Sequence, residues 1–156
     1  MDPVLVLRWL HVIGACVLLG TGAGIAFFML MAWRTGRSDL IAHVSGTVVI
    51  ADYLFTATAV IAQPITGILL ARAIGWPLSS RWIEAATALY VVTGAFWLPV
   101  VWIQKRIRDL ARTAAARGEP PPPEARRLFR IWFVFGFPAF AAVLAIMWLM
   151  LARPLL

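Results

Sequence analysis

The sequence is poor in charged residues and in cysteine. Asp, Glu, Lys and Arg make up 13% of the 156 residues, whereas a soluble globular domain carries about a quarter. Because 62% of the residues are apolar, a water-soluble fold and an intrinsically disordered chain are both excluded. Cys16 is the single cysteine, so a disulfide-stabilised secreted module is excluded as well. The length predicts a single domain over residues 1–156.

Motifs of common catalytic and metal sites are also missing. The sequence has no Cys-x-x-Cys pair, no His-x-x-x-His pair and no cluster of carboxylates, which are the spacings typical of metal sites. It likewise has no glycine-rich phosphate loop and no nucleophile elbow. These absences leave open whether the protein is an enzyme.

Long apolar runs dominate the sequence instead. Four of them reach or exceed about twenty residues, the length that crosses the hydrocarbon core as a helix. We expect helices because lipid offers no hydrogen-bond partner to an exposed backbone. The predicted spans are residues 4–33, 40–71, 82–103 and 128–152. The sequence therefore predicts an all-α integral membrane protein built as a four-helix bundle.

The distribution of positive charge predicts the orientation. Ten Lys and Arg residues lie in or beside the loops after the first and third spans, against four on the other side. The positive-inside rule then places the basic loop, residues 104–127, in the cytoplasm and both termini on the periplasmic side. We expect a bacterial inner-membrane protein surrounded by the lipid bilayer. Nucleic-acid binding is not expected, because the cations lie between apolar runs.

The third loop is expected to have helical structure of its own. Residues 105–117 continue the third helix, Gly118 and Glu119 end it, and residues 120–123 form a polyproline turn. Glu124 then opens the fourth helix.

His11 is an ionisable residue inside the first span. It lies about eight residues, or roughly 10 Å, from the outer end of the helix, and helical phase places Gly14, Ala15 and Gly22 near its face. Small residues there would let another helix or a flat ligand approach. A neutral imidazole in an apolar bundle can ligate haem iron, with Met147 as second ligand or with five-coordinate iron. The alternative is a hydrogen-bonded structural histidine.

The second span carries a polar stripe made of Asp52, Thr56, Ala59, Gln63 and Thr66. Asp52 and Gln63 are eleven residues apart, so they share a face of an α-helix. Gln63 lies at about the depth of His11 and is grouped with it as a candidate cofactor-binding residue. Asp52 should be protonated or heavily hydrogen-bonded if it is buried. The stripe indicates either a polar clasp between helices or a proton- or metal-coupled transport path.

Three spans contain an interior proline: Pro64, Pro99 and Pro138. Each removes one backbone donor and frees the carbonyl four residues earlier. We expect each freed carbonyl beside a cavity, a hydroxyl group or a neighbouring helix.

Short segments along nearly the whole chain carry a family resemblance. They are residues 10–15 (LHVIGA), 63–67 (QPITG), 97–104 (WLPVVWIQ), 108–111 (RDLA), 127–133 (RLFRIWF) and 152–154 (ARP). Together they resemble domain-of-unknown-function family 2269, a family of predicted integral membrane proteins of bacteria.

More distantly, the layout is similar to that of HemJ-type protoporphyrinogen oxidases and CopD-like membrane proteins, which also open with a Leu-His pair in the first span. In HemJ-type proteins that histidine is implicated in haem binding, and the matching residue here is His11. The resemblance therefore implies haem b as cofactor. HemJ-type proteins also carry an important lysine in the third span, whereas residues 82–103 contain none.

The leading hypothesis is a small inner-membrane protein that binds b-type haem through His11 for redox or haem-related chemistry. Three alternatives stay open: a cofactor-free membrane subunit or assembly factor, a proton- or metal-coupled transporter, and a HemJ-like oxidase. The sequence also leaves open a homo-oligomer or a membrane redox partner.

Overall fold

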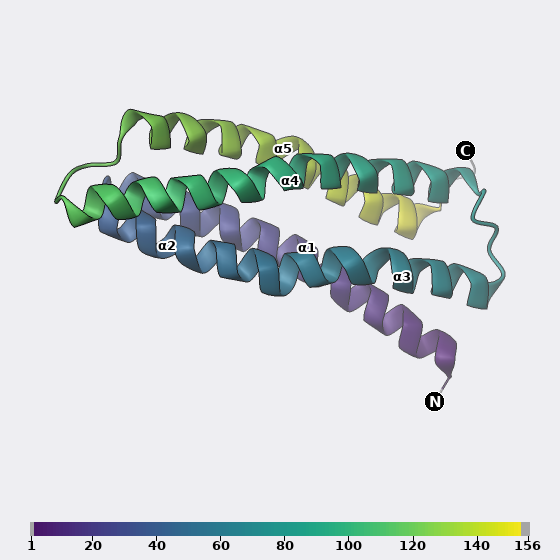
Figure 1. The fold of residues 1–156 in the computed structure, drawn as a ribbon. Helices are drawn as coiled ribbons and strands as arrows, with labels where there is room; N and C mark the ends of the chain where they lie inside the picture. The colour runs from purple at the N-terminus through teal and green to yellow at the C-terminus, as the bar shows by residue number, and fades with distance from the viewer. Residues whose placement is uncertain (1, 154–156) are drawn as a thin grey trace.

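The chain folds into long helices joined by short turns. The computed structural model describes residues 2–153. In chain order the helices are α1 (Pro3–Arg34), α2 (Ser38–Ala51), the π-helix η1 (Asp52–Thr56), α3 (Ala57–Ile74), α4 (Arg81–Ala116) and α5 (Pro123–Ala152) (Figure 1).

Four stretches of this chain are long and apolar enough to cross a membrane. They are α1, the continuous segment Ser38–Ile74, α4 and α5, counted over the described residues. The predicted all-α fold with four candidate spans is confirmed. At most of the helix ends, the predicted and the observed boundaries differ by only a few residues. This agreement arises because lipid requires an apolar run to be helical.

The basic segment 104–127 is helical over most of its length. α4 continues to Ala116, and Gly118 adopts a φ of 66°, the left-handed conformation typical of a residue just past a helix C-terminus. α5 begins at Pro123, one residue before the expected start. The turn between α4 and α5 is thereby restricted to residues 117–122.

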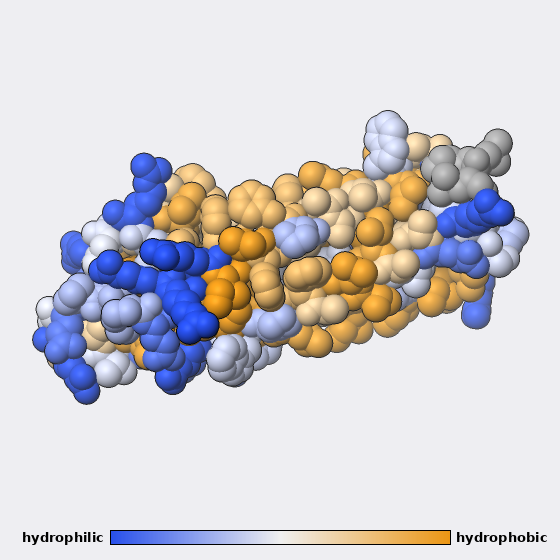
Figure 2. All heavy atoms as spheres, turned by 90° about the horizontal axis from the view of Figure 1, so that it is seen from above, coloured by the Kyte–Doolittle hydropathy of each residue, from blue (hydrophilic) through white to orange (hydrophobic). Residues whose placement is uncertain are grey.

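The bundle has two chemically different ends. We call the end with the α1–α2 and α4–α5 turns the basic end, and the opposite end, where α1 starts and α5 finishes, the terminal end (Figure 1). An apolar belt separates polar residues that gather at both ends (Figure 2). This is the surface pattern that a membrane-spanning bundle requires.

Tight packing is concentrated toward the basic end. Met29, Ile41 and Ile107 have no exposed surface, and they belong to one cluster drawn from α1, α2, α4 and α5. Trp33 of α1 stacks on Phe129 of α5 with ring centroids 4.7 Å apart. Toward the terminal end the helices associate chiefly as two pairs, α1 with α3 and α4 with α5 (Figure 1).

A hydrogen bond to a carbonyl freed by proline links these two pairs. Pro64 cannot donate to the carbonyl of Val60 four residues earlier. The hydroxyl of Tyr90 on α4 donates to that carbonyl oxygen instead. The expectation that a freed carbonyl lies beside a hydroxyl of a neighbouring helix is therefore confirmed for Pro64.

Candidate functional site

His11 lies in the contact between α1 and α3 and is 9% exposed. Its Nδ1 is 2.9 Å from Oγ1 of Thr66, and the Thr66 hydroxyl donates to the carbonyl of Ala62 at 2.8 Å. Because the hydroxyl proton is engaged with Ala62, the Thr66 oxygen acts as the acceptor of a hydrogen bond from Nδ1–H. This arrangement favours the tautomer that leaves the lone pair on Nε2.

Two glycines leave space in which a polar side chain of each helix packs against the backbone of the other. The amide Nε2 of Gln63 donates to the carbonyl oxygen of His11 at 2.8 Å, and a Cβ at Gly14 would collide with that amide. On the other helix, a Cβ at Gly67 would lie 3.1 Å from Cε1 of His11. We call His11, Gly14, Gln63, Thr66 and Gly67 the histidine clasp. Each glycine in it makes room for a side chain of the opposite helix.

The structure thus brings together some of the predicted site residues and separates others. His11, Gly14 and Gln63 contact one another as described. Gly22 is exposed, and a Cβ there would meet nothing within 4 Å. Ala15 is partly exposed on α1, and Met147 lies on α5, which packs chiefly against α4. The small residues of α1 therefore do not act together as one flat surface.

A second polar group lies where the second span meets α4. Asp52 and Thr56 of η1 are 4% and 9% exposed, and Gln104 of α4 is 1% exposed. The side chains of Thr56, Gln104 and Trp97 face the Asp52 carboxyl. We call these four residues the buried polar cluster.

Each member of this cluster has a buried polar atom without a hydrogen-bond partner among the described residues. The four atoms are Asp52 Oδ2, Thr56 Oγ1, Trp97 Nε1 and Gln104 Oε1. Sequence reasoning identified Asp52 and Thr56 but did not place Gln104 or Trp97 in a site. The available signal was their spacing of seven residues, which puts them on one face of α4.

The π-helix η1 explains why Asp52 and Gln63 have different neighbours. An α-helix would place them on one face, but the wider turns of a π-helix change the helical phase between the residues before and after it. Asp52 faces Gln104 and Trp97 of α4, whereas Gln63 bonds to the α1 backbone. The two side chains therefore have different partners, although η1 and α3 both pack against α1.

Residues 2–153 contain no group of three or more His, Cys, Asp or Glu side chains that could hold a metal ion.

Comparison with known proteins gives one similarity. A family described as "Predicted integral membrane protein (DUF2269)" matches residues 5–154. No curated protein and no solved structure matches the chain.

Proposed function

We propose that this chain, which belongs to the DUF2269 family of predicted integral membrane proteins, binds b-type haem through His11 for redox or haem-related chemistry. The observation that carries this proposal is the state of the imidazole. Nδ1 lies 2.9 Å from the Thr66 hydroxyl oxygen, which leaves Nε2 as the ring nitrogen without a side-chain partner among the described residues. A histidine that ligates a metal through one ring nitrogen typically donates the other N–H to an oriented acceptor. The resemblance to HemJ-type proteins supports the same residue.

The residues of the clasp divide the work of holding such a group. His11 Nε2 would hold the iron, and Thr66 would keep the imidazole in the tautomer and orientation needed. The Gln63 side chain packs where Gly14 has no side chain and donates to the His11 carbonyl, and this contact positions α1 against α3. A haem bound there supplies a one-electron redox couple. Met147 lies on α5, which packs chiefly against α4, so we do not propose it as a second ligand.

The same proposal includes location and orientation. Ten of the 14 Lys and Arg residues lie in or near the basic end, and by the positive-inside rule this charge supports a cytoplasmic basic end and an outer terminal end in a bacterial inner membrane. His11 would then lie in the periplasmic half of the inner membrane.

Replacement of His11 tests the haem proposal. The protein, purified in mild detergent after haem supplementation, is expected to show a Soret band that His11→Ala abolishes. Thr66→Val is expected to weaken haem retention by about 10- to 100-fold, as for other residues that orient a metal ligand. His43→Ala, which alters an exposed histidine of α2, is the matched control and should keep the band. A colourless wild-type protein, or an unchanged band in His11→Ala, would contradict the proposal.

Proton-coupled transport is a second candidate function, and the buried polar cluster supports it. The cluster buries a polar atom of each of four side chains that face one another, and such a group is costly in lipid unless its members are fully paired or reached by water or a substrate. π-Helices also occur frequently at functional sites.

Asp52→Asn tests this second candidate in proteoliposomes that enclose a pH-sensitive dye. Under an imposed potassium diffusion potential, wild-type vesicles are expected to take up protons and Asp52→Asn vesicles to behave like protein-free ones. Glu84→Gln changes an exposed carboxylate of α4 and should leave the flux intact. A flux that is the same with Asp52 and with asparagine would reject the candidate.

A further inference from the structure

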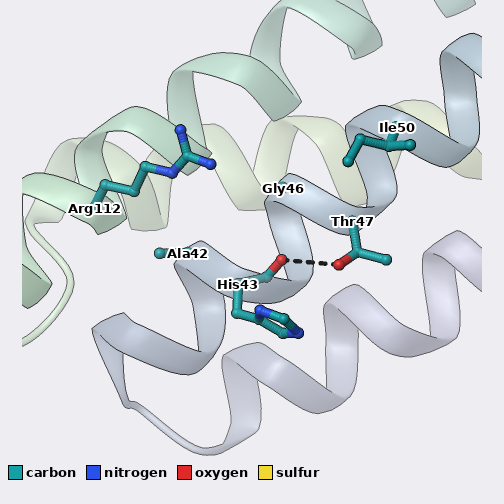
Figure 3. A pocket seen from close by; sticks show the side chains of 6 residues that line it. All are labelled: Ala42, His43, Gly46, Thr47, Ile50 and Arg112. Carbon is teal, nitrogen blue, oxygen red and sulfur yellow. Dashed lines mark hydrogen bonds between the residues drawn. The ribbon is translucent and has the colours of Figure 1, made fainter.

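An open groove lies between α2 and α4 near the basic end, away from the histidine clasp. Its volume is about 400 Å³, and its lining residues are Ala42, His43, Gly46, Thr47, Ile50 and Arg112 (Figure 3). Neither function proposed above uses these residues.

The α4 side of the groove has unneutralised positive charge. The guanidinium of Arg112 takes part in no salt bridge among the described residues, whereas Arg108 is paired with Asp109 at 2.8 Å. Lys105 and both arginines lie near that one acid. Arg112 is therefore available to an anion, and its fork of N–H donors suits a phosphate oxygen pair.

Gly46 provides the room beside Arg112. A Cβ at this position would lie 3.5 Å from Nη2 of Arg112 and 4.0 Å from Cδ of Arg108. A larger side chain would extend into the same space. Thr47 donates to the backbone carbonyl of His43 at 3.2 Å (Figure 3), so the Thr47 hydroxyl proton is already engaged within α2.

The α2 side becomes apolar with distance from the basic end. Ile50 is 67% exposed, and Leu54, one helical turn further on, is 57% exposed. The groove thus runs from Arg112 at the basic end toward exposed apolar side chains of the second span. A free phosphate ion would contact only the basic part of the groove at Arg112. A phospholipid would contact that part with its headgroup and the apolar part with an acyl chain.

We propose that this groove binds an anionic phospholipid. The phosphate lies against Arg112 in the space beside Gly46, and an acyl chain follows Ile50 and Leu54. Basic residues between helices at a membrane surface attract anionic headgroups in this way. The commitment to a lipid follows from the apolar continuation of the groove, which a soluble anion does not require.

Native mass spectrometry of the full chain in detergent tests the proposal, with phosphatidylglycerol and phosphatidylcholine added in turn. The wild-type protein is expected to retain phosphatidylglycerol in preference to phosphatidylcholine. Arg112→Ala should reduce this retention about tenfold, the loss expected for one charge-assisted hydrogen bond. Gly46→Leu should produce a similar loss with every charge unchanged, because leucine fills the groove.

Two matched controls separate the groove from general effects. Arg117→Ala removes a cation just past the end of α4, and Gly22→Leu adds a leucine at an open position of α1; both should retain the lipid, and circular dichroism should show equal helicity in all variants. Equal retention of the two lipids by the wild-type protein, or full retention by both Arg112→Ala and Gly46→Leu, would overturn the proposal. Competition by inorganic phosphate that removes the lipid completely would assign the groove to a soluble anion instead.

Discussion

Gly67→Leu is expected to push α1 away from α3 and to lower the free energy of unfolding by about 1–3 kcal/mol, the usual range for overpacking. Even a Cβ at Gly67 would lie 3.1 Å from Cε1 of His11, and leucine adds three more carbons beyond it. The imidazole cannot simply rotate away, because Thr66 holds its Nδ1 at 2.9 Å. The strain must therefore be relieved by moving the helices apart.

Other glycine-to-leucine changes provide the comparison. Gly20 and Gly22 are exposed positions of α1, and a Cβ at either would meet nothing within 4 Å. Leucine should be neutral or stabilising there, since it favours a helix over glycine by roughly 1 kcal/mol. Gly14→Leu should fall between, because the amide it displaces ends a flexible Gln63 side chain. Unfolding in mixed micelles, followed by circular dichroism, measures the series. Equal stability of Gly67→Leu and Gly22→Leu would show that the clasp is not tightly packed.

Ile107→Ala is expected to have the largest effect on stability, about 2–5 kcal/mol. Ile107 has no exposed surface and belongs to the same cluster as Met29 and Ile41. Between two helices in lipid, truncation loses packing but little transfer free energy, because lipid tails are as apolar as the core. Ile107, however, is preceded by Arg106 and followed by Arg108, so it lies where the bundle meets the membrane surface. There the loss of transfer free energy and the cavity both contribute.

Ile61→Ala is the matched control for this prediction. Ile61 of α3 is 64% exposed. Its side chain therefore faces lipid both before and after truncation, and little packing is lost. Its unfolding midpoint in the same micelles should stay at the wild-type value. If Ile107→Ala also unfolds at the wild-type midpoint, the cluster at the basic end does not control stability.

The spans could be predicted from the sequence because the bilayer sets few and strict conditions. The apolar run of α1 ends beside Arg34, and α4 continues through Lys105 and Arg106 to end before Gly118. Each boundary follows from hydropathy or from a helix-ending residue near it in sequence. The same conditions predicted that Pro64 would need a partner for the Val60 carbonyl, although they did not identify Tyr90 as that partner.

The candidate sites could be predicted only in part, since they depend on contacts between distant helices. His11 and Gln63 were placed at similar depth by counting residues, and the structure joins them through the His11 carbonyl. For Asp52 the count assumed an unbroken α-helix, whereas the π-helix η1 begins at this residue and changes the helical phase. Gly14 was interpreted as room for a ligand, whereas the Gln63 side chain occupies that room.

The bond between Tyr90 and the Val60 carbonyl also bears on biogenesis. The two residues are 30 positions apart, so during synthesis the second span is complete before its partner has been translated. Until then the carbonyl needs water or the insertion machinery as a temporary donor. When the third span is inserted, the Tyr90 hydroxyl replaces this temporary donor. A nascent chain that ends before Tyr90 leaves the Val60 carbonyl oxygen without a hydrogen-bond donor from the protein.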